Sequence, residues 1–438
     1  MDRSPAAADG GDTKSRPRDL FRDAEFAALA SVRFVSGMSF ATVIIALALY
    51  ADLFSASGTV AGLFGAAYGA VRLVLVLPLG RMIDVGNSKR YLLIGLALNV
   101  LLFVGLTLVE SIEHVIVLRG LQGAGTTVLW ITGVSLVGQI SPDDNRTFWI
   151  GTYNQVRSIA SLSGDIVGGA LLFEYGFTVT YAVLIALTVL SVGSVTLFVR
   201  HDAGDRADPD DVTGFETLVR LLKRRAIVAL VVFRFAFSFG KNAVLIFLPI
   251  YARTEFGMSA FLIGGILAGG KLAKGLSQGY VGDWADRVGG YEWFILAGTI
   301  IYALGTALVP MATPISRAVG GVEVPGFPGE ASVLPAFVAL FLAYVLIGIA
   351  DSLRLPTSMA LFVEEGEYYD AVAGSLSLRT VSWQIGTIVG PVVVGAVFDV
   401  VSFSAGFWLA AGSMIVAGWA FIHLYESEVE PDPTVPTD

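Results

Sequence analysis

Twelve long apolar segments, separated by short polar turns, dominate the pattern of this chain of 438 residues. A helix needs roughly 20 apolar residues to cross a hydrocarbon core of about 30 Å, and each segment reaches that length. The strands of a membrane β-barrel would instead alternate polar and apolar residues over about 10 positions. We therefore predict an all-α membrane protein with twelve transmembrane helices. The predicted spans are 24–52, 57–80, 90–109, 114–140, 147–172, 177–199, 226–252, 258–280, 291–312, 332–363, 371–398 and 403–424.

Polar segments at both ends and in the middle of the chain divide these spans into two sets of six. The first polar segment lacks the short apolar core and the small-residue cleavage site of a signal peptide. The middle segment begins with acidic residues and ends with basic ones. The predicted organisation is a cytoplasmic tail at 1–23, six-helix bundles at 24–200 and 226–425, a cytoplasmic linker at 201–225 and an acidic cytoplasmic tail at 426–438.

The distribution of Lys and Arg between the polar turns predicts the orientation of the chain. With the N-terminus in the cytoplasm, sixteen of these residues fall in inner segments and two, Arg253 and Arg317, in outer loops. Cytoplasmic loops of membrane proteins carry an excess of Lys and Arg. We expect a multi-pass protein of the cell (inner or cytoplasmic) membrane with both termini in the cytoplasm.

Matching residues recur in the same order in the two predicted bundles, which indicates an internal repeat. The offset between matched residues grows along the chain, and the long predicted loop 313–331 explains that growth. The matched pairs include Arg33 with Arg234, Arg72 with Lys274 and Arg157 with Arg379, at offsets of 201, 202 and 222 residues.

The turns after the second and eighth predicted spans carry the same motif. It resembles the signature loop of the major facilitator superfamily, Gly-x-x-x-Asp-x-x-Gly-x-(Arg/Lys), with Asn87 in place of the second Gly in the first copy. The resemblance implies that these loops form a gate that holds one face closed. Its residues are Gly80, Asp84 and Lys89 in the first loop and Gly282, Asp286 and Arg287 in the second.

Two further motifs extend this resemblance over essentially all twelve spans. The fourth span opens with Arg119, Gln122 and Gly123, in an arrangement similar to the family motif Arg-x-x-Gln-Gly-x-Gly. The fifth span resembles the antiporter motif Gly-Pro-x-x-Gly-Gly, but Asp165 replaces its Pro, which weakens an interpretation as a drug:proton antiporter. The resemblance implies two bundles that rock around a central substrate site by alternating access.

The composition argues against several classes of function. Charged residues make up 15% of the chain, against about 25% in soluble domains, and the net charge of -9 disfavours nucleic acid as a partner. The chain has no Cys and three widely separated His. We expect no metal, no cofactor and no enzymatic activity.

Ten Lys and Arg residues fall inside the predicted spans, most of them near the midplane. A charge at the bilayer centre costs about 2.5–3.5 kcal/mol on insertion scales, so such residues should face a cavity and have partners. We predict that a transported anion neutralises them, because a guanidinium group matches carboxylate, phosphate or nitrate. Arg33 with Arg234 and Arg72 with Lys274 are expected to form basic pairs across the two bundles. The predicted substrate-binding residues are Arg33, Arg72, Arg157, Arg234, Lys241, Lys274 and Arg379.

Coupling to protons requires a carboxylate within the membrane, and Asp165 and Asp351 are the candidates. Asp351 could instead simply neutralise Arg354, three residues further along the same helix. Asp165 could be solvated near the outer mouth, and Lys271 could snorkel or be deprotonated. Exchange of one anion for another would need no such carboxylate.

These observations favour a monomeric secondary transporter in the lipid bilayer that carries a small organic or inorganic anion, together with protons or in exchange for a counter-anion. Efflux of lipophilic compounds is the alternative, in which the basic residues would be incidental to transport. A transporter-like membrane sensor, which binds its ligand without moving it, is an alternative of another class.

Overall fold

A computed structural model describes residues 20–142, 145–200, 215–319, 333–369 and 371–425. The described residues form helices and turns, without a strand. The N-half comprises α2 (Ala24–Leu53), α3 (Gly58–Val85), α4 (Ser88–Thr107), α5 (Ile112–Ile140), α6 (Arg146–Ser163), a π-helical turn (Gly164–Gly168) and α7 (Gly169–Phe198). The C-half comprises α8 (Phe215–Leu221), α9 (Arg225–Phe256), α10 (Ala260–Val288), α11 (Tyr291–Leu308), a 3-10 turn (Val309–Met311), α12 (Ala312–Val319), α13 (Leu334–Tyr368), α14 (Val372–Val400) and α15 (Phe403–Leu424).

Short polar residues and glycine determine where the helices begin and end. Asp23 accepts hydrogen bonds from the backbone N–H groups of Glu25 and Phe26, both at 2.9 Å, and so caps α2. Such caps stabilise a helix by about 1 kcal/mol. At the end of α9, Gly257 adopts a left-handed conformation (φ 66°) that costs glycine no side-chain strain.

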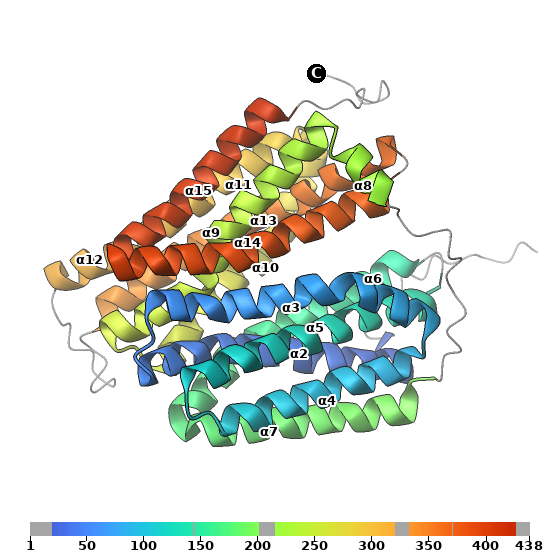
Figure 1. Cartoon of the computed structure of the whole chain (residues 1–438), viewed down its shortest axis with the longest axis horizontal. Coiled ribbons are helices and arrows are strands. Elements are labelled where there is room, and N and C mark those ends of the chain that lie inside the picture. The colour runs from blue at the N-terminus through green and yellow to red at the C-terminus, as the bar shows by residue number, and fades with distance from the viewer. Residues whose placement is uncertain (1–19, 143–144, 201–214, 320–332, 370, 426–438) are drawn as a thin grey trace, which may run out of the picture.

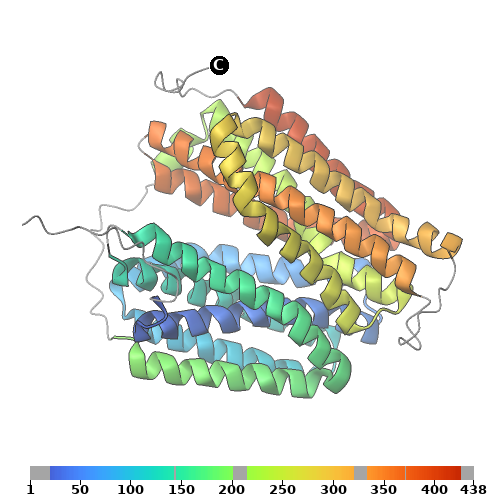
Figure 2. The same cartoon turned by 180° about the vertical axis from the view of Figure 1, so that it is seen from behind.

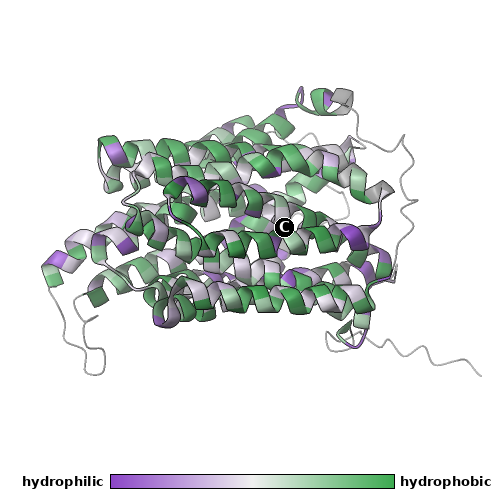
Figure 3. Cartoon of the chain, turned by 60° about the horizontal axis from the view of Figure 1, so that its bottom comes forward, coloured by the Kyte–Doolittle hydropathy of each residue, from purple (hydrophilic) through white to green (hydrophobic). Residues whose placement is uncertain are grey.

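The helices have the length and composition of membrane spans, and the prediction of an all-α membrane protein is confirmed. Among the described residues, eleven segments are long and apolar enough to cross a bilayer. One of them, Phe148–Phe198, has 51 residues and turns at Gly176, whose φ is 71°. The chain therefore crosses twice in this segment, as the two predicted spans 147–172 and 177–199 require. Apolar residues dominate the helix surfaces (Figure 3).

The two halves lie one above the other and approach most closely at one end (Figure 1). This closed end carries the turns 54–57, 257–259 and 401–402, and α3 packs there along α14. Gly62 is so close to the backbone of Pro391 that a Cβ would clash with it. The ribbons of the halves separate toward the opposite, diverging end, which carries residues 86–87 and 289–290, and the view from behind agrees (Figure 2).

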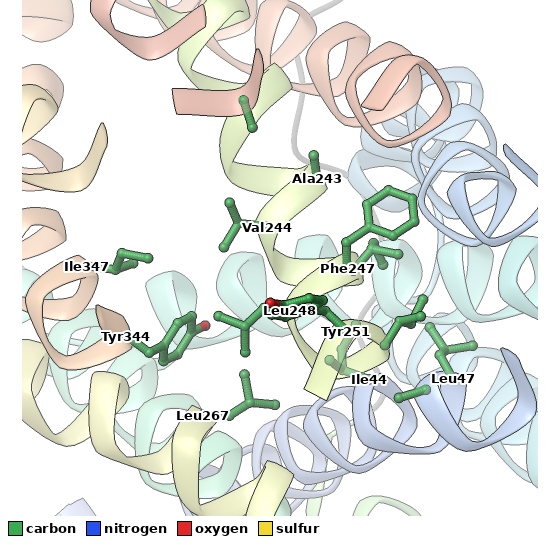
Figure 4. Packing of buried hydrophobic residues seen from close by; sticks show 14 of the residues in the cluster. Ile44, Leu47, Ala243, Val244, Phe247, Leu248, Tyr251, Leu267, Tyr344 and Ile347 are labelled. Atoms are coloured by element: carbon green, nitrogen blue, oxygen red, sulfur yellow. The ribbon is translucent and has the colours of Figure 1, made fainter. Parts of the chain in front are cut away.

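An apolar cluster between the halves seals the closed end (Figure 4). Ile44 and Leu47 of α2 belong to the same buried cluster as Phe247 and Tyr251 of α9, and all four are at most 3% exposed. The cluster extends through α10 and α13 to Leu267 and Tyr344. Because burial of one large apolar side chain contributes about 1.5–3 kcal/mol, this shared core holds the closed end together.

Polar contacts reinforce the closed end. Asp399 of α14 accepts hydrogen bonds from the backbone N–H groups of Gly58 and Thr59, at 2.5 and 2.8 Å, and so caps α3 from the other half. Asp52 of α2 forms an ion pair with Arg253 of α9 at 2.8 Å. Both contacts would have to break for this end to open.

Candidate functional site

A single carboxylate in the C-half collects three cations. Asp351 of α13 accepts hydrogen bonds from Lys241 of α9 at 2.7 Å, Lys274 of α10 at 2.8 Å and Arg354 of its own helix at 2.8 Å. The side chain of Asp351 is 7% exposed, whereas those of Lys241 and Lys274 are 22% and 29% exposed. The cluster is therefore mostly buried and yet reached by solvent through its two lysines. The local pair between Asp351 and Arg354 is present, but it is only part of this larger cluster.

Aromatic rings surround the cations of this cluster. The guanidinium of Arg354 lies 3.7 Å from the ring centre of Phe237, and Lys241 Nζ lies 5.5 Å from that of Tyr302. Arg234 stacks on Trp383 at 4.1 Å, and its buried Nε and Nη1 atoms have no hydrogen-bond partner among the described residues. A cation over an aromatic face is stabilised by about 0.5–2 kcal/mol, which offsets only part of the cost of its burial.

The N-half holds a second basic cluster, formed by Arg33 of α2, Arg72 of α3 and Arg157 of α6, and the charges of the three act on one another. Arg33 donates a hydrogen bond to Asn154 at 2.9 Å, and Arg72 donates one to the hydroxyl of Tyr68 at 3.1 Å. The buried Nε atoms of Arg33 and Arg72 have no partner among the described residues. The side chain of Arg157 is exposed.

The basic residues thus group by half, and the structure differs from the predicted pairing across the bundles. Arg33 contacts Tyr153 and Asn154 rather than Arg234, and Lys274 binds Asp351 rather than lying beside Arg72. The physical reason is the position of the partners: Tyr153 and Asn154 hold Arg33 within the N-half, and Asp351 holds Lys274 within the C-half. Arg379 of α14 lies close enough to Arg354 and Arg234 for their charges to interact, and its Nε has no partner among the described residues.

The interpretation of Asp165 as a solvated residue is wrong. Its side chain is fully buried in the π-helical turn and lies 2.6 Å from Nζ of Lys271 on α10, so the ion pair joins the two halves. Lys271 also donates a hydrogen bond to the hydroxyl of Ser161 at 2.7 Å. Burial explains the pairing, because neither charge could stay in a low-dielectric region without a partner.

The motif of the fourth predicted span packs α5 against α3. Arg119 is 2% exposed, donates to the backbone carbonyl of Phe64 on α3 at 3.0 Å and also hydrogen-bonds the side chain of Gln122. Gly123 lies against the backbone of Tyr68, where a Cβ would not fit. These residues join α5 to α3 and place the ring of Tyr68 beside Arg72.

The two signature loops lie at the diverging end. The side chains of Asp84 and Asp286, as well as residue 80, lie outside the described part of the structure. Lys89 donates a hydrogen bond to the carbonyl of Thr196 at 2.8 Å, inside the N-half. Gly282 is part of α10, and Arg287 forms an exposed ion pair with Asp283, one turn away on the same helix.

Sequence reasoning missed the neutral partners of the basic residues. Asn154, Ser161 and Tyr68 hold Arg33, Lys271 and Arg72. A signal was present, because Asn154, Arg157, Ser161 and Asp165 recur every three or four residues, which is the spacing of one polar helix face. Among the described residues, no group of three or more acidic or histidine side chains could hold a metal ion.

Comparisons with known proteins agree with this architecture. A sequence model of the Major Facilitator Superfamily matches residues 29–322 and 235–437. The multidrug resistance protein MdtG of Enterobacter lignolyticus (strain SCF1) is 24% identical over 390 residues, which cover 86% of this chain and 86% of MdtG. The multidrug resistance protein Stp of Mycobacterium tuberculosis (strain ATCC 25618 / H37Rv) is 25% identical over 150 residues, and this match spans only 28% of the length of Stp.

Solved structures with a similar fold are more distant in sequence. The nucleoside transporter NupG matches with a TM-score of 0.71 at 14% identity, over 92% of this chain and 99% of NupG. A peptide transporter of the POT type, solved in complex with sulfate, matches with a TM-score of 0.72 at 13% identity, over 94% of this chain and 98% of the transporter. At this identity the likeness concerns the fold.

Proposed function

Because the chain belongs to the Major Facilitator Superfamily and is a secondary transporter of that family, we propose that its cargo is a small anion, organic or inorganic. One observation carries the proposal. Among the described residues, the five arginines of the predicted substrate-binding set have no carboxylate at ion-pair distance, and they come from both halves. They are Arg33, Arg72, Arg157, Arg234 and Arg379.

These positive charges are costly without an anion beside them. Asp351 and Asp165 are already paired with four other cations. Arg33 and Arg234 are 5% and 6% exposed, so water hydrates them poorly. A cation at this depth is costly, and a bound anion that accepts its hydrogen bonds would offset much of that cost.

The distribution of Lys and Arg supports an orientation in which the diverging end faces the cytoplasm. The closed end, with its apolar seal, then faces the outside of the cell membrane, and both termini are cytoplasmic. The two bundles 24–200 and 226–425 would move relative to each other around the charged layer. In this arrangement the signature loops with Asp84 and Asp286 would lie at the cytoplasmic gate.

Asp165 is the better candidate for proton coupling, because its ion pair with Lys271 joins the two halves. Neutralising Asp165 by a proton would weaken a contact that must break when the closed end opens. Asp351, held by three cations within one half, is the weaker candidate. Exchange against a counter-anion needs neither residue.

Transport by the full-length protein in proteoliposomes tests the proposal. Labelled benzoate, phosphate and nitrate would be offered with and without a pH gradient, alongside a lipophilic cationic dye. We expect anion flux, and we expect Arg33→Gln to lower it about 10- to 100-fold, which corresponds to loss of one hydrogen bond to a charged group. Arg317→Gln, at an exposed position of α12, is the matched control that removes a charge outside the membrane layer.

Efflux of lipophilic compounds is the second candidate, and the names of the relatives MdtG and Stp favour it. Dye export that is unchanged by Arg33→Gln and Arg234→Gln, without anion flux, would support this candidate and contradict the first. Anion binding without flux under every gradient would instead identify a membrane sensor.

A further inference from the structure

We propose that the charged group of the anion binds in the N-half, between Arg33, Arg72 and Arg157, and that the C-half contributes an aromatic wall rather than the main anion-binding charges. This inference rests on the proposed anion transport and specifies its site. The ligand class is an organic oxyanion, with a carboxylate, sulfonate or phosphate group on a body that can lie against aromatic rings.

Repeat-related cations of the two halves have different neighbours. Arg72 and Lys274 occupy matching positions, 202 residues apart. Lys274 donates to the carboxylate of Asp351 at 2.8 Å, whereas the guanidinium of Arg72 lies 5.9 Å from the ring centre of Trp130. Trp130 precedes Asp351 by 221 residues, close to the offset of 222 between Arg157 and Arg379. The C-half therefore contains an internal carboxylate where the N-half has a neutral ring.

The two halves also differ in the positive charges that have no carboxylate partner. In the N-half three guanidinium groups repel one another, and no described carboxylate lies at ion-pair distance from any of them. In the C-half the charge of Asp351 also reaches Arg234, and the ring of Trp383 covers the guanidinium of Arg234. Lys241, Lys274 and Arg354 already share Asp351, which leaves only Arg234 and Arg379 of the C-half set for a second anion, against three arginines in the N-half.

The arginine cluster of the N-half is accessible to solvent and is held by neutral side chains. Arg157 is exposed and comes from α6, Arg33 comes from α2 and Arg72 from α3, so three helices contribute to the cluster. Asn154 and Tyr68 hold the outer nitrogens of Arg33 and Arg72 and leave the two Nε–H groups without a partner among the described residues. Guanidinium groups held in this way are preorganised for an oxyanion.

Across the charged layer, aromatic side chains of the C-half supply the apolar wall. Trp383 lies beside Arg234 and Lys241 and is partly exposed, whereas Tyr302, which also lies beside Lys241, is buried. A planar apolar ring of the ligand would gain contact area by stacking on this wall, and it would need no charge to do so. The arrangement fits a ligand with one oxyanion and one planar apolar part.

Titration calorimetry of the full-length protein in nanodiscs tests the inference, with benzoate, phenyl phosphate and inorganic phosphate as probes. The decisive comparison is between repeat-related variants. We expect Arg157→Gln to raise the Kd for benzoate and phenyl phosphate about 10- to 100-fold, and Arg379→Gln to raise it less than about threefold. We also expect inorganic phosphate to bind more weakly than phenyl phosphate.

A second variant tests the inference without removing an arginine. Trp130→Asp supplies the N-half with an internal carboxylate beside Arg72 and should weaken anion binding as much as Arg157→Gln. Trp130→Asn is its uncharged control and should weaken binding less. Equal losses for Arg157→Gln and Arg379→Gln, or unchanged binding in Trp130→Asp, would overturn the inference. If the wild-type protein bound none of the three probes, the proposal of anion transport would itself fail.

Discussion

The middle layer and the closed end of this protein both join helices through carboxylates, but the carboxylates differ in burial. In the middle, Asp351 and Asp165 are 5% and 0% exposed. At the closed end, Asp52 and Asp399 are exposed residues. Burial, rather than the number of contacts, determines how much each carboxylate contributes to stability. A buried carboxylate cannot lose its partner cheaply, whereas water and salt compensate an exposed one.

Removing Asp351 should have the largest effect. Asp351→Ala leaves Lys241, Lys274 and Arg354 without their shared anion, and removing one partner of a buried ion pair typically costs about 3–5 kcal/mol. We expect a markedly lower unfolding temperature of the detergent-solubilised protein. Asp351→Asn, which keeps the shape and loses the charge, should fall in between. An unfolding temperature unchanged in both variants would show that the lysines are hydrated rather than held by Asp351.

Removing the charge of Asp165 should come next and should act on conformation. The chain has no Cys, so a single Leu248→Cys substitution in the apolar seal reports opening of the closed end through its reaction with a maleimide. In that background Asp165→Asn should accelerate labelling, because it removes an ion pair between the halves and leaves Lys271 without its carboxylate partner.

The double variant Asp165→Asn with Lys271→Gln is the control for this second prediction. It removes both charges and should label more slowly than Asp165→Asn alone, because no uncompensated cation remains. Equal labelling of the two variants would contradict a coupling between Asp165 and Lys271 across the halves.

The cap that Asp399 places on α3 should have a smaller effect. Asp399→Ala removes the acceptor for the backbone N–H groups of Gly58 and Thr59, and loss of such a cap costs about 1 kcal/mol. We expect faster labelling of Leu248→Cys by several-fold at most. Ser402→Ala, which removes the cap of α15 inside one half, is the matched control and should leave labelling unchanged.

The ion pair between Asp52 and Arg253 should have the smallest effect. Its side chains are 40% and 32% exposed, and pairs of this kind are worth about 0.2–1 kcal/mol. We expect Asp52→Asn to change the labelling rate slightly at low ionic strength. At 1 M salt, where the Debye length is about 3 Å, the difference from wild type should vanish. A difference that persists at 1 M salt would place this pair with the buried ones.

The sequence predicts the fold well because the bilayer requires every span to be apolar over its whole length. Apolar length alone identified the helices, and the break between 172 and 177 placed the turn at Gly176. The internal repeat likewise identified Arg33 and Arg234 as related positions. Both signals are local or periodic, so a single sequence contains them.

The partners of the charged residues could not be predicted in the same way. Asp165 and Lys271 are 106 residues apart and come from different halves, so no local pattern links them. The π-helical turn that contains Asp165 depends on packing: Gly164 lies against the backbone of Met38, and Gly168 lies against Thr42. Such contacts exist only once α2 has packed against this part of the N-half.

The π-helical turn Gly164–Gly168 has a mechanical consequence. A π-helical turn holds one residue more than an α-helical turn, and such turns are frequent at functional sites. If the extra residue slipped out of the turn, one part of the helix would rotate by about 100° against the other. Asp165 would then swing away from Lys271 while Arg157, two turns earlier, kept its orientation. A shift of the backbone by one residue at this turn would thus break the ion pair between the halves and leave the arginine cluster in place.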